Sequence, residues 1–197
     1  MNKMIKLTSV VAVTVALAQS LQAVPVNGAI GFSGVGVTFN TGTAATATAV
    51  TSFIAPDVSG ISGTFAAPSP FAVANGTPVV FNPATWNFAS GPVASFWAVG
   101  GFTFNLLSSF ILTQGGTPGV NAYVVVDGTG TVSGNGYTPT QMSWSFTSQD
   151  PASGSNPTSW SFSASANSQS VPDGGATVML LGIALSGVAL LRKKLAA

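Results

Sequence analysis

Between residues 24 and 170, apolar and polar side chains alternate in one short segment after another. The segment 160–166 is the clearest case, because its even-numbered residues are Trp, Phe, Ala and Ala and its odd-numbered residues are all serine. Successive side chains of a β-strand point to opposite faces, so this period of two predicts strands with one buried face and one face in water. Segments 102–106, 120–126 and 142–146 follow the same pattern. No stretch of this region has the spacing of an amphipathic helix, and the pattern therefore favours an all-β domain.

Glycine, proline and asparagine separate these segments at positions typical of turns. Asn75-Gly76, Asp127-Gly128 and Asn135-Gly136 are dipeptides that favour tight turns. Many short strands joined by such turns predict an antiparallel β-sandwich or a barrel-like sheet. Within residues 30–39 the parity of the apolar residues changes at Ser33-Gly34, which predicts a β-bulge. We expect the core to include Phe32, Phe104, Val124, Trp144 and Phe162.

The four tryptophans all lie in strand-like segments. One of these segments, Ser143-Trp144-Ser145-Phe146, recurs as Ser-Trp-Ser-Phe at residues 159–162. The echo indicates two neighbouring strands that both place Trp and Phe in the core. The alternative is a carbohydrate-stacking platform, since the indole ring is amphipathic.

Charge is almost absent from the central region. All five basic residues lie near the two ends of the chain, and residues 24–170 keep only Asp57, Asp127 and Asp150. An average soluble domain is about one quarter charged, so the surface of this domain must be wetted by hydroxyl and amide groups instead. A region without a basic patch excludes nucleic acid as a partner. The chain also has no cysteine, which excludes a disulfide framework.

The same composition limits the chemistry of the domain. Residues 24–170 contain no His, Glu, Lys or Cys, so neither a Ser-His-Asp set nor a Ser-Lys pair can form. Zinc sites favour the absent His and Cys, and a single acid in the 127–130 loop falls short of a calcium site. We therefore predict no catalytic residue, no metal ligand, no cofactor and no enzymatic activity.

The N-terminal segment has the features of a secretory signal peptide. Lys3 and Lys6 form a positive start, residues 7–18 are largely apolar, and Ala23 is a small residue at a plausible cleavage position. The apolar stretch is too short for a comfortable membrane span. We predict a signal peptide over residues 1–23, which implies a partner in the secretion machinery.

The C-terminal segment combines a turn, an apolar stretch and a basic cluster. The turn is Val171-Pro172-Asp173-Gly174-Gly175, and residues 176–191 contain neither charge nor proline. As a helix, the apolar stretch would span roughly 24 Å, slightly less than the hydrocarbon core of a bilayer. Arg192, Lys193 and Lys194 would keep this end cytoplasmic. The sequence thus predicts one transmembrane helix over 176–191 and a basic stop over 192–194; a plain membrane anchor without processing is the alternative.

These parts, in this order, resemble the C-terminal sorting domain of the PEP-CTERM class in its VPDSG-CTERM variant. The resemblance covers mainly residues 171–197, and Gly174 stands where the motif usually has Ser. It implies export, processing by an exosortase-type enzyme near the motif, and delivery to the cell surface, outer envelope or extracellular matrix of a bacterium. It also implies exopolysaccharide as a partner.

The expected organisation is a signal peptide (1–23), an exported β-rich domain (24–163), a linker (164–170) and a sorting domain (171–197). We expect a cell-surface or matrix structural protein that is anchored in the membrane only in transit. A carbohydrate-binding surface module is the alternative, although the sequence does not identify its ligand-facing residues. An outer-membrane β-barrel fits less well, because its lumen would lack charge and its last strand would be followed by the C-terminal segment.

Overall fold

A computed structural model of the chain describes residues 24–150 and 159–166. Apart from two short 3₁₀ turns, the regular structure in these residues is β-strand. The strands are β1 (Gly28–Ser33), β2 (Gly36–Phe39), β3 (Ala49–Ile54), β4 (Asp57–Ile61), β5 (Val80–Phe81), β6 (Trp86–Asn87), β7 (Val93–Val99), β8 (Phe102–Gly115), β9 (Tyr123–Gly134), β10 (Tyr137–Gln149) and β11 (Ser159–Ala166). The 3₁₀ turns are η1 (Ala44–Thr46) and η2 (Gly63–Phe65). The predicted all-β class is confirmed.

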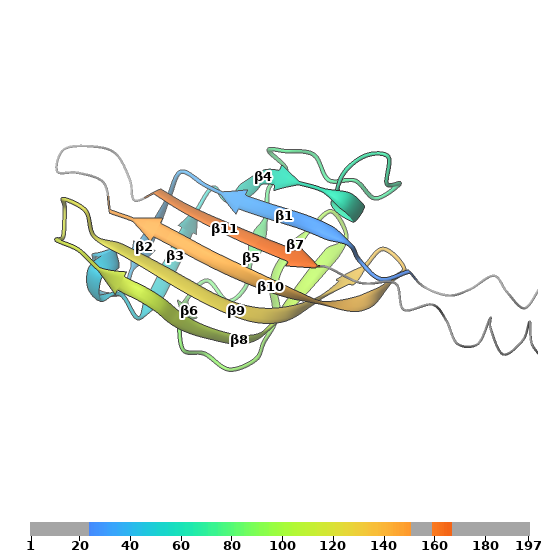
Figure 1. The fold of residues 1–197 in the computed structure, drawn as a ribbon. Coiled ribbons are helices and arrows are strands. Elements are labelled where there is room, and N and C mark those ends of the chain that lie inside the picture. The colour runs from blue at the N-terminus through green and yellow to red at the C-terminus, as the bar shows by residue number, and fades with distance from the viewer. Residues whose placement is uncertain (1–23, 151–158, 167–197) are drawn as a thin grey trace, which may run out of the picture.

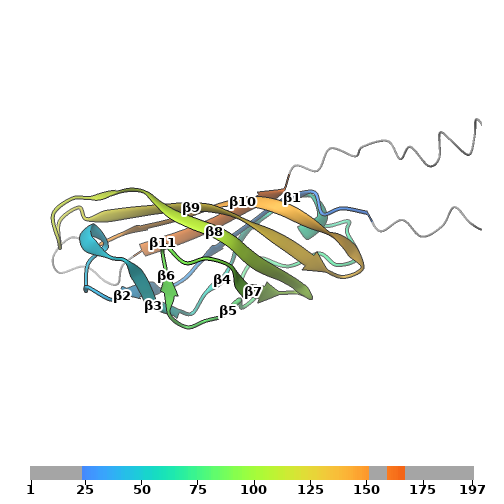
Figure 2. The same ribbon diagram turned by 90° about the horizontal axis from the view of Figure 1, so that it is seen from below.

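The strands form two antiparallel sheets. The main sheet has eight strands in the order β4-β1-β11-β10-β9-β8-β7-β5, and the small sheet has the order β2-β3-β6. The main sheet curls, and the small sheet lies against its inner side (Figures 1 and 2). The arrangement has the two layers expected of a sandwich, with the main sheet curving around the smaller one.

The strict alternation of β9, β10 and β11 divides the main sheet into a buried inner face and a polar outer face. All five residues expected in the core, Phe32, Phe104, Val124, Trp144 and Phe162, are buried. The echoed Ser-Trp-Ser-Phe segments lie in β10 and β11, which pair directly, as predicted. The period of two predicted these buried residues correctly because it depends only on the order of residues within each strand.

Aromatic rings join the two sheets. Trp86 of the small sheet packs against Trp144 and Phe146 of the main sheet, with ring centroids 5.5 Å apart in both pairs. Phe162 stacks on Trp144 at 5.4 Å and on Phe32 at 5.6 Å. Edge-on and stacked aromatic pairs of this kind stabilise a core beyond the area that they bury. These rings therefore belong to one core shared by the two sheets.

Glycine in the centre of β9 makes room for two of these rings. A Cβ atom at Gly128 would overlap the Trp144 ring and the Ser108 carbonyl, and one at Gly130 would overlap the Phe104 ring. The expected turn at Asp127-Gly128 is therefore wrong, because both residues lie inside β9. The local turn preference yields to packing, since only glycine leaves space for the aromatic side chain beside it.

The expected bulge at Ser33-Gly34 is also wrong. The parity changes there because the chain leaves β1 in the main sheet and enters β2 in the small sheet. Gly34 lies at this crossing, where a Cβ atom would meet the Ile54 carbonyl and the Trp160 ring. Register shifts occur instead at other places, among them Gly31/Phe32 in β1, Thr38/Phe39 in β2, and Leu106/Ser108 and Ile111/Thr113 in β8.

The tight turns of the main sheet include two of the two-residue type. Asn135 and Gly136 join β9 to β10 with φ of 53° and 77°, and Gly100 and Gly101 join β7 to β8 with φ of 56° and 80°. Positive φ at both positions is the geometry of a type I′ hairpin, which matches the twist of paired strands. The turn predicted at Asn135-Gly136 is confirmed.

The two ends of the described domain lie side by side. Gly28 at the start of β1 pairs with Ala166 at the end of β11. Val24 and Val26 precede β1 and are held to β10, because the Thr138 N–H donates to the Val24 carbonyl and the Val26 N–H donates to Thr140 Oγ1. β11 continues past residue 163, where the sequence placed the end of the domain, and stops at Ala166.

Candidate functional site

Two regions are candidates for function: the C-terminal segment and the outer face of the main sheet. The predicted signal cleavage at Ala23, the motif Val171–Gly175 and the basic stop Arg192–Lys194 all lie outside the described residues. In the part of the chain that is described, no helix is long and apolar enough to cross a membrane. The described residues include Ala166, the last residue of β11, and the outer face of the main sheet.

The outer face is an array of hydroxyl groups with two carboxylates, Asp127 in β9 and Asp57 in the edge strand β4. Strand register places Asp127, Ser145 and Ser163 in one row across β9, β10 and β11. The next row contains Thr129, Ser143 and Ser165. Neighbouring strands lie about 4.8 Å apart, so each row presents closely spaced oxygen atoms.

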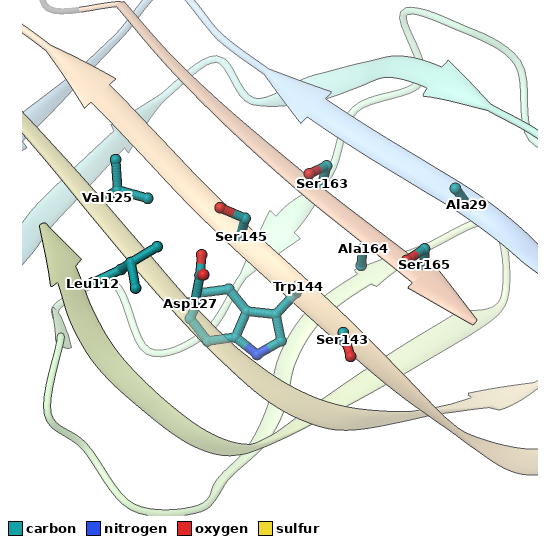
Figure 3. Close-up of a pocket in the computed structure, with 10 residues that line it drawn as sticks. All are labelled: Ala29, Leu112, Val125, Asp127, Ser143, Trp144, Ser145, Ser163, Ala164 and Ser165. Carbon is teal, nitrogen blue, oxygen red and sulfur yellow. The ribbon is translucent and has the colours of Figure 1, made fainter. Parts of the chain in front are cut away.

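A shallow hollow of about 380 Å³ lies over these rows. Its polar lining comes from Asp127 and four serines, and Leu112 and Val125 border it on one side (Figure 3). The full lining consists of Ala29, Leu112, Val125, Asp127, Ser143, Trp144, Ser145, Ser163, Ala164 and Ser165. The indole of Trp144 is turned to the core and only 3% of its surface is exposed, so it forms the floor and offers no stacking surface.

The polar groups of the hollow are free to bind. Within residues 24–150 and 159–166, the hydroxyls of Ser143, Ser145, Ser163 and Ser165 make no hydrogen bond. Oδ1 of Asp127 is buried and also lacks a hydrogen-bond partner among these residues. A buried acceptor without a donor is costly. The set suits a neutral ligand that carries several hydroxyl groups.

The tryptophans do not form the carbohydrate platform that was considered as an alternative. Trp86, Trp97, Trp144 and Trp160 are each 5% exposed or less, and all belong to the core. Their rings interlock with phenylalanines, so none is available to stack on a sugar.

The three aspartates of the domain do not meet. Asp57 lies in β4 and Asp127 in β9, with β1, β11 and β10 between them in the main sheet. Asp150 follows β10 and accepts hydrogen bonds from the Thr43 hydroxyl at 2.6 Å and the Ala44 N–H at 3.0 Å. Among the described residues, no group of three or more acidic, His or Cys side chains could hold a metal ion.

Sequence reasoning missed the hollow, although part of its signal was present. Alternating serines in 143–145 and 163–165 place hydroxyls on one face of each strand. Their meeting depends on the register that sets Ser143 opposite Ser165 and Ser145 opposite Ser163. Asp127-Gly128 has the composition of a turn, so the sequence does not predict that Asp127 lies in the same row.

Comparison with protein families bears on the C-terminal segment. The family model for the VPDSG-CTERM motif matches residues 170–195. This segment is a VPDSG-CTERM motif. The match spans the Val-Pro-Asp-Gly-Gly turn, the apolar stretch and the basic cluster, the three parts on which the resemblance rested.

The VPDSG-CTERM motif implies an exported bacterial protein that is directed to the cell surface and processed by an exosortase-type enzyme. It covers only the end of the chain and carries no information about the β domain. Neither the comparison with curated proteins nor the comparison with solved structures found a match.

Proposed function

We propose that the chain is a non-catalytic structural module of the bacterial surface or extracellular matrix, held at the cytoplasmic membrane only until an exosortase-type enzyme releases it. The observation that carries this proposal is the VPDSG-CTERM motif at residues 170–195. In this proposal Pro172 and Asp173 are the residues that the enzyme reads, residues 176–191 form the temporary anchor, and Arg192–Lys194 retain the cytoplasmic end.

The geometry of the domain supports display from one end. Since Gly28 and Ala166 are paired neighbours, the segments before and after the domain leave it at the same end. The turn between β8 and β9 lies at the opposite end (Figure 1). Residues 167–175 could bridge at most about 30 Å when fully extended. An anchor at 176–191 would therefore hold the paired end near the membrane and point the β8–β9 turn outward.

The composition of the domain also supports a structural role. The three aspartates of the domain lie apart from one another, and its core is dominated by interlocked aromatic rings. A rigid surface of hydroxyl groups with little charge suits contact with neutral polymers better than it suits acid–base chemistry.

Sorting is tested by changing the motif and following the mature mass. Pro172→Ala with Asp173→Ala should leave the full-length chain in the cytoplasmic membrane, because the enzyme no longer recognises the turn. The matched control changes Ser168 and Gln169 to alanine, directly before the matched segment, and should be released like the wild type. Cell fractionation with mass spectrometry of the C-terminus distinguishes these outcomes. If the wild-type protein stays full-length in the membrane, the segment is only an anchor and the sorting proposal is wrong.

Carbohydrate binding at the serine-lined hollow is a second candidate function. The observation that favours it is the Asp127 carboxylate beside four serine hydroxyls that have no hydrogen-bond partner among the described residues. A sugar has hydroxyl groups that can donate to the carboxylate and the serine oxygens. It also has an apolar C–H face that can pack against Leu112 and Val125.

This second candidate has its own test. Asp127→Asn and Ser163→Val should each weaken binding of the exported protein to a neutral-polysaccharide array by about tenfold, as expected for the loss of a hydrogen bond of about 1.4 kcal/mol. Thr131→Val, on the same face but outside the hollow, should leave binding unchanged. An array with no binding by the wild type would reject this function without affecting the sorting proposal.

A further inference from the structure

The sheet edges of this domain are protected unequally. The outer edge of β4 is covered by a neighbouring segment: the Val58 N–H donates to the Thr77 carbonyl at 3.0 Å, and the Gly76 N–H donates to the Val58 carbonyl at 2.8 Å. At the other end of the main sheet, β5 is only two residues long. Short or covered edges of this kind are how proteins prevent unwanted strand pairing.

The second half of β8 lacks such protection. β7 pairs with β8 only as far as Leu106, although β8 continues to Gly115. Among the described residues, positions 107–115 therefore pair as a strand with β9 alone. Their contacts with other segments include side-chain hydrogen bonds: the Ser109 hydroxyl donates to the Ser90 carbonyl, and the Gln114 amide donates to the carbonyls of Ala44 and Ala47. We call residues 107–115 the free edge of β8.

Large apolar side chains gather on the same segment. The exposed fractions are 42% for Leu107, 52% for Phe110, 37% for Ile111 and 58% for Leu112. The other exposed large apolar residues of the described chain are Val24, Val35, Ile54, Phe71, Val80 and Val120, of which Val35 and Ile54 are hydrogen-bonded neighbours. Neither a charged residue nor a proline, the usual guards of an edge strand, occurs between residues 102 and 115.

The open backbone groups and the uncharged side chains of the free edge indicate which partner can bind there. Open backbone N–H and C=O groups are best paired by another extended strand, which presents the same groups at the same spacing. An uncharged apolar edge offers no counter-charge to an ionic partner, but it does not repel an identical edge. In an antiparallel two-fold pairing the segment faces itself, so that apolar side chains meet apolar side chains.

We propose that the free edge of β8 pairs antiparallel, over residues 108–111, with the same edge of a second copy and continues the main sheet across a two-fold axis. The bulges at Leu106/Ser108 and Ile111/Thr113 restrict regular pairing to the residues between them. The dimer is therefore small and weak, and it forms where copies are concentrated, as on a surface or in a matrix. The proposal rests on the sheet edge and is independent of how the chain is sorted.

Cysteine cross-linking tests the pairing directly, because the natural chain contains no cysteine. Single cysteines at Leu107, Ser108, Phe110 and Leu112 are introduced one at a time into the full chain, and the exported protein is oxidised and separated on a non-reducing gel. Disulfide-linked dimers should form most strongly at the position nearest the two-fold axis and fall off on either side. Ser163→Cys, exposed on the same face but in the interior strand β11, should not cross-link. Cross-linking no stronger than that of this control would overturn the proposal.

A second measurement avoids any dependence on disulfide chemistry. The mass of the exported wild type, followed by sedimentation, should rise with concentration from one copy to two. Phe110→Lys should abolish this rise, because it places like charges face to face across the axis, whereas Ser163→Lys adds the same charge elsewhere and should preserve it. A wild type that remains monomeric throughout, or a Phe110→Lys variant that still dimerises, would refute the pairing, and a stable complex only with a different protein would do so as well.

Discussion

Replacing Trp144 with alanine should remove a large part of the stability of the β domain. Trp144 is almost fully buried, stacks on Phe162 with ring centroids 5.4 Å apart, and packs against Trp86 at 5.5 Å. A tryptophan buries up to about 250 Å², which at roughly 25 cal/mol per Å² gives an upper bound near 6 kcal/mol. Measured aromatic truncations in cores cost about 3–5 kcal/mol, and we expect a loss in that range.

Two variants separate the loss of packing from other effects. Trp144→Phe should cost clearly less, because it keeps an aromatic ring and because Nε1 of Trp144 has no hydrogen-bond partner among the described residues to lose. Ser143→Ala changes the adjacent residue on the exposed face and should stay within about 0.5 kcal/mol of the wild type.

Urea unfolding followed by far-ultraviolet circular dichroism measures the effect without relying on tryptophan fluorescence. With a typical slope of about 1–3 kcal/mol per molar urea, a loss of about 4 kcal/mol lowers the midpoint by more than about 1 M. A loss under about 1 kcal/mol, or one equal to that of Ser143→Ala, would refute the view that Trp144 is a central contact between the sheets.

Three further predictions concern other parts of the chain. Gly128→Ala should destabilise the domain by ~1–3 kcal/mol in the same assay, because its Cβ would overlap the Trp144 ring and the Ser108 carbonyl, whereas Gly60→Ala, with open space around it, should be nearly neutral. Asp150→Ala should cost about 1–3 kcal/mol and Asp150→Asn less, since the carboxylate accepts from both Thr43 and Ala44; equal costs would contradict a role for these hydrogen bonds. N-terminal sequencing of the exported protein should begin at Val24, or less readily at Gln19, and an intact Met1 on surface-located protein would disprove signal cleavage.

Local patterns were sufficient to predict much of this protein. The period of two in 142–146 and 160–166 identified the strands and their buried faces, because side-chain direction in a strand depends only on position along that strand. The C-terminal motif could also be recognised from its sequence, since the order of turn, apolar stretch and basic cluster is a property of contiguous residues.

The tertiary structure decided what depends on contacts between distant segments. Asp127-Gly128 has the composition of a turn, yet the Trp144 ring from β10 requires glycine inside β9. The serine-lined hollow exists only because β9, β10 and β11 pair in a register that aligns Asp127, Ser145 and Ser163. The free edge of β8 exists because β7 stops pairing at Leu106. A local period determines which face of a strand is buried, whereas strand order, register and open edges follow from long-range packing that no single segment encodes.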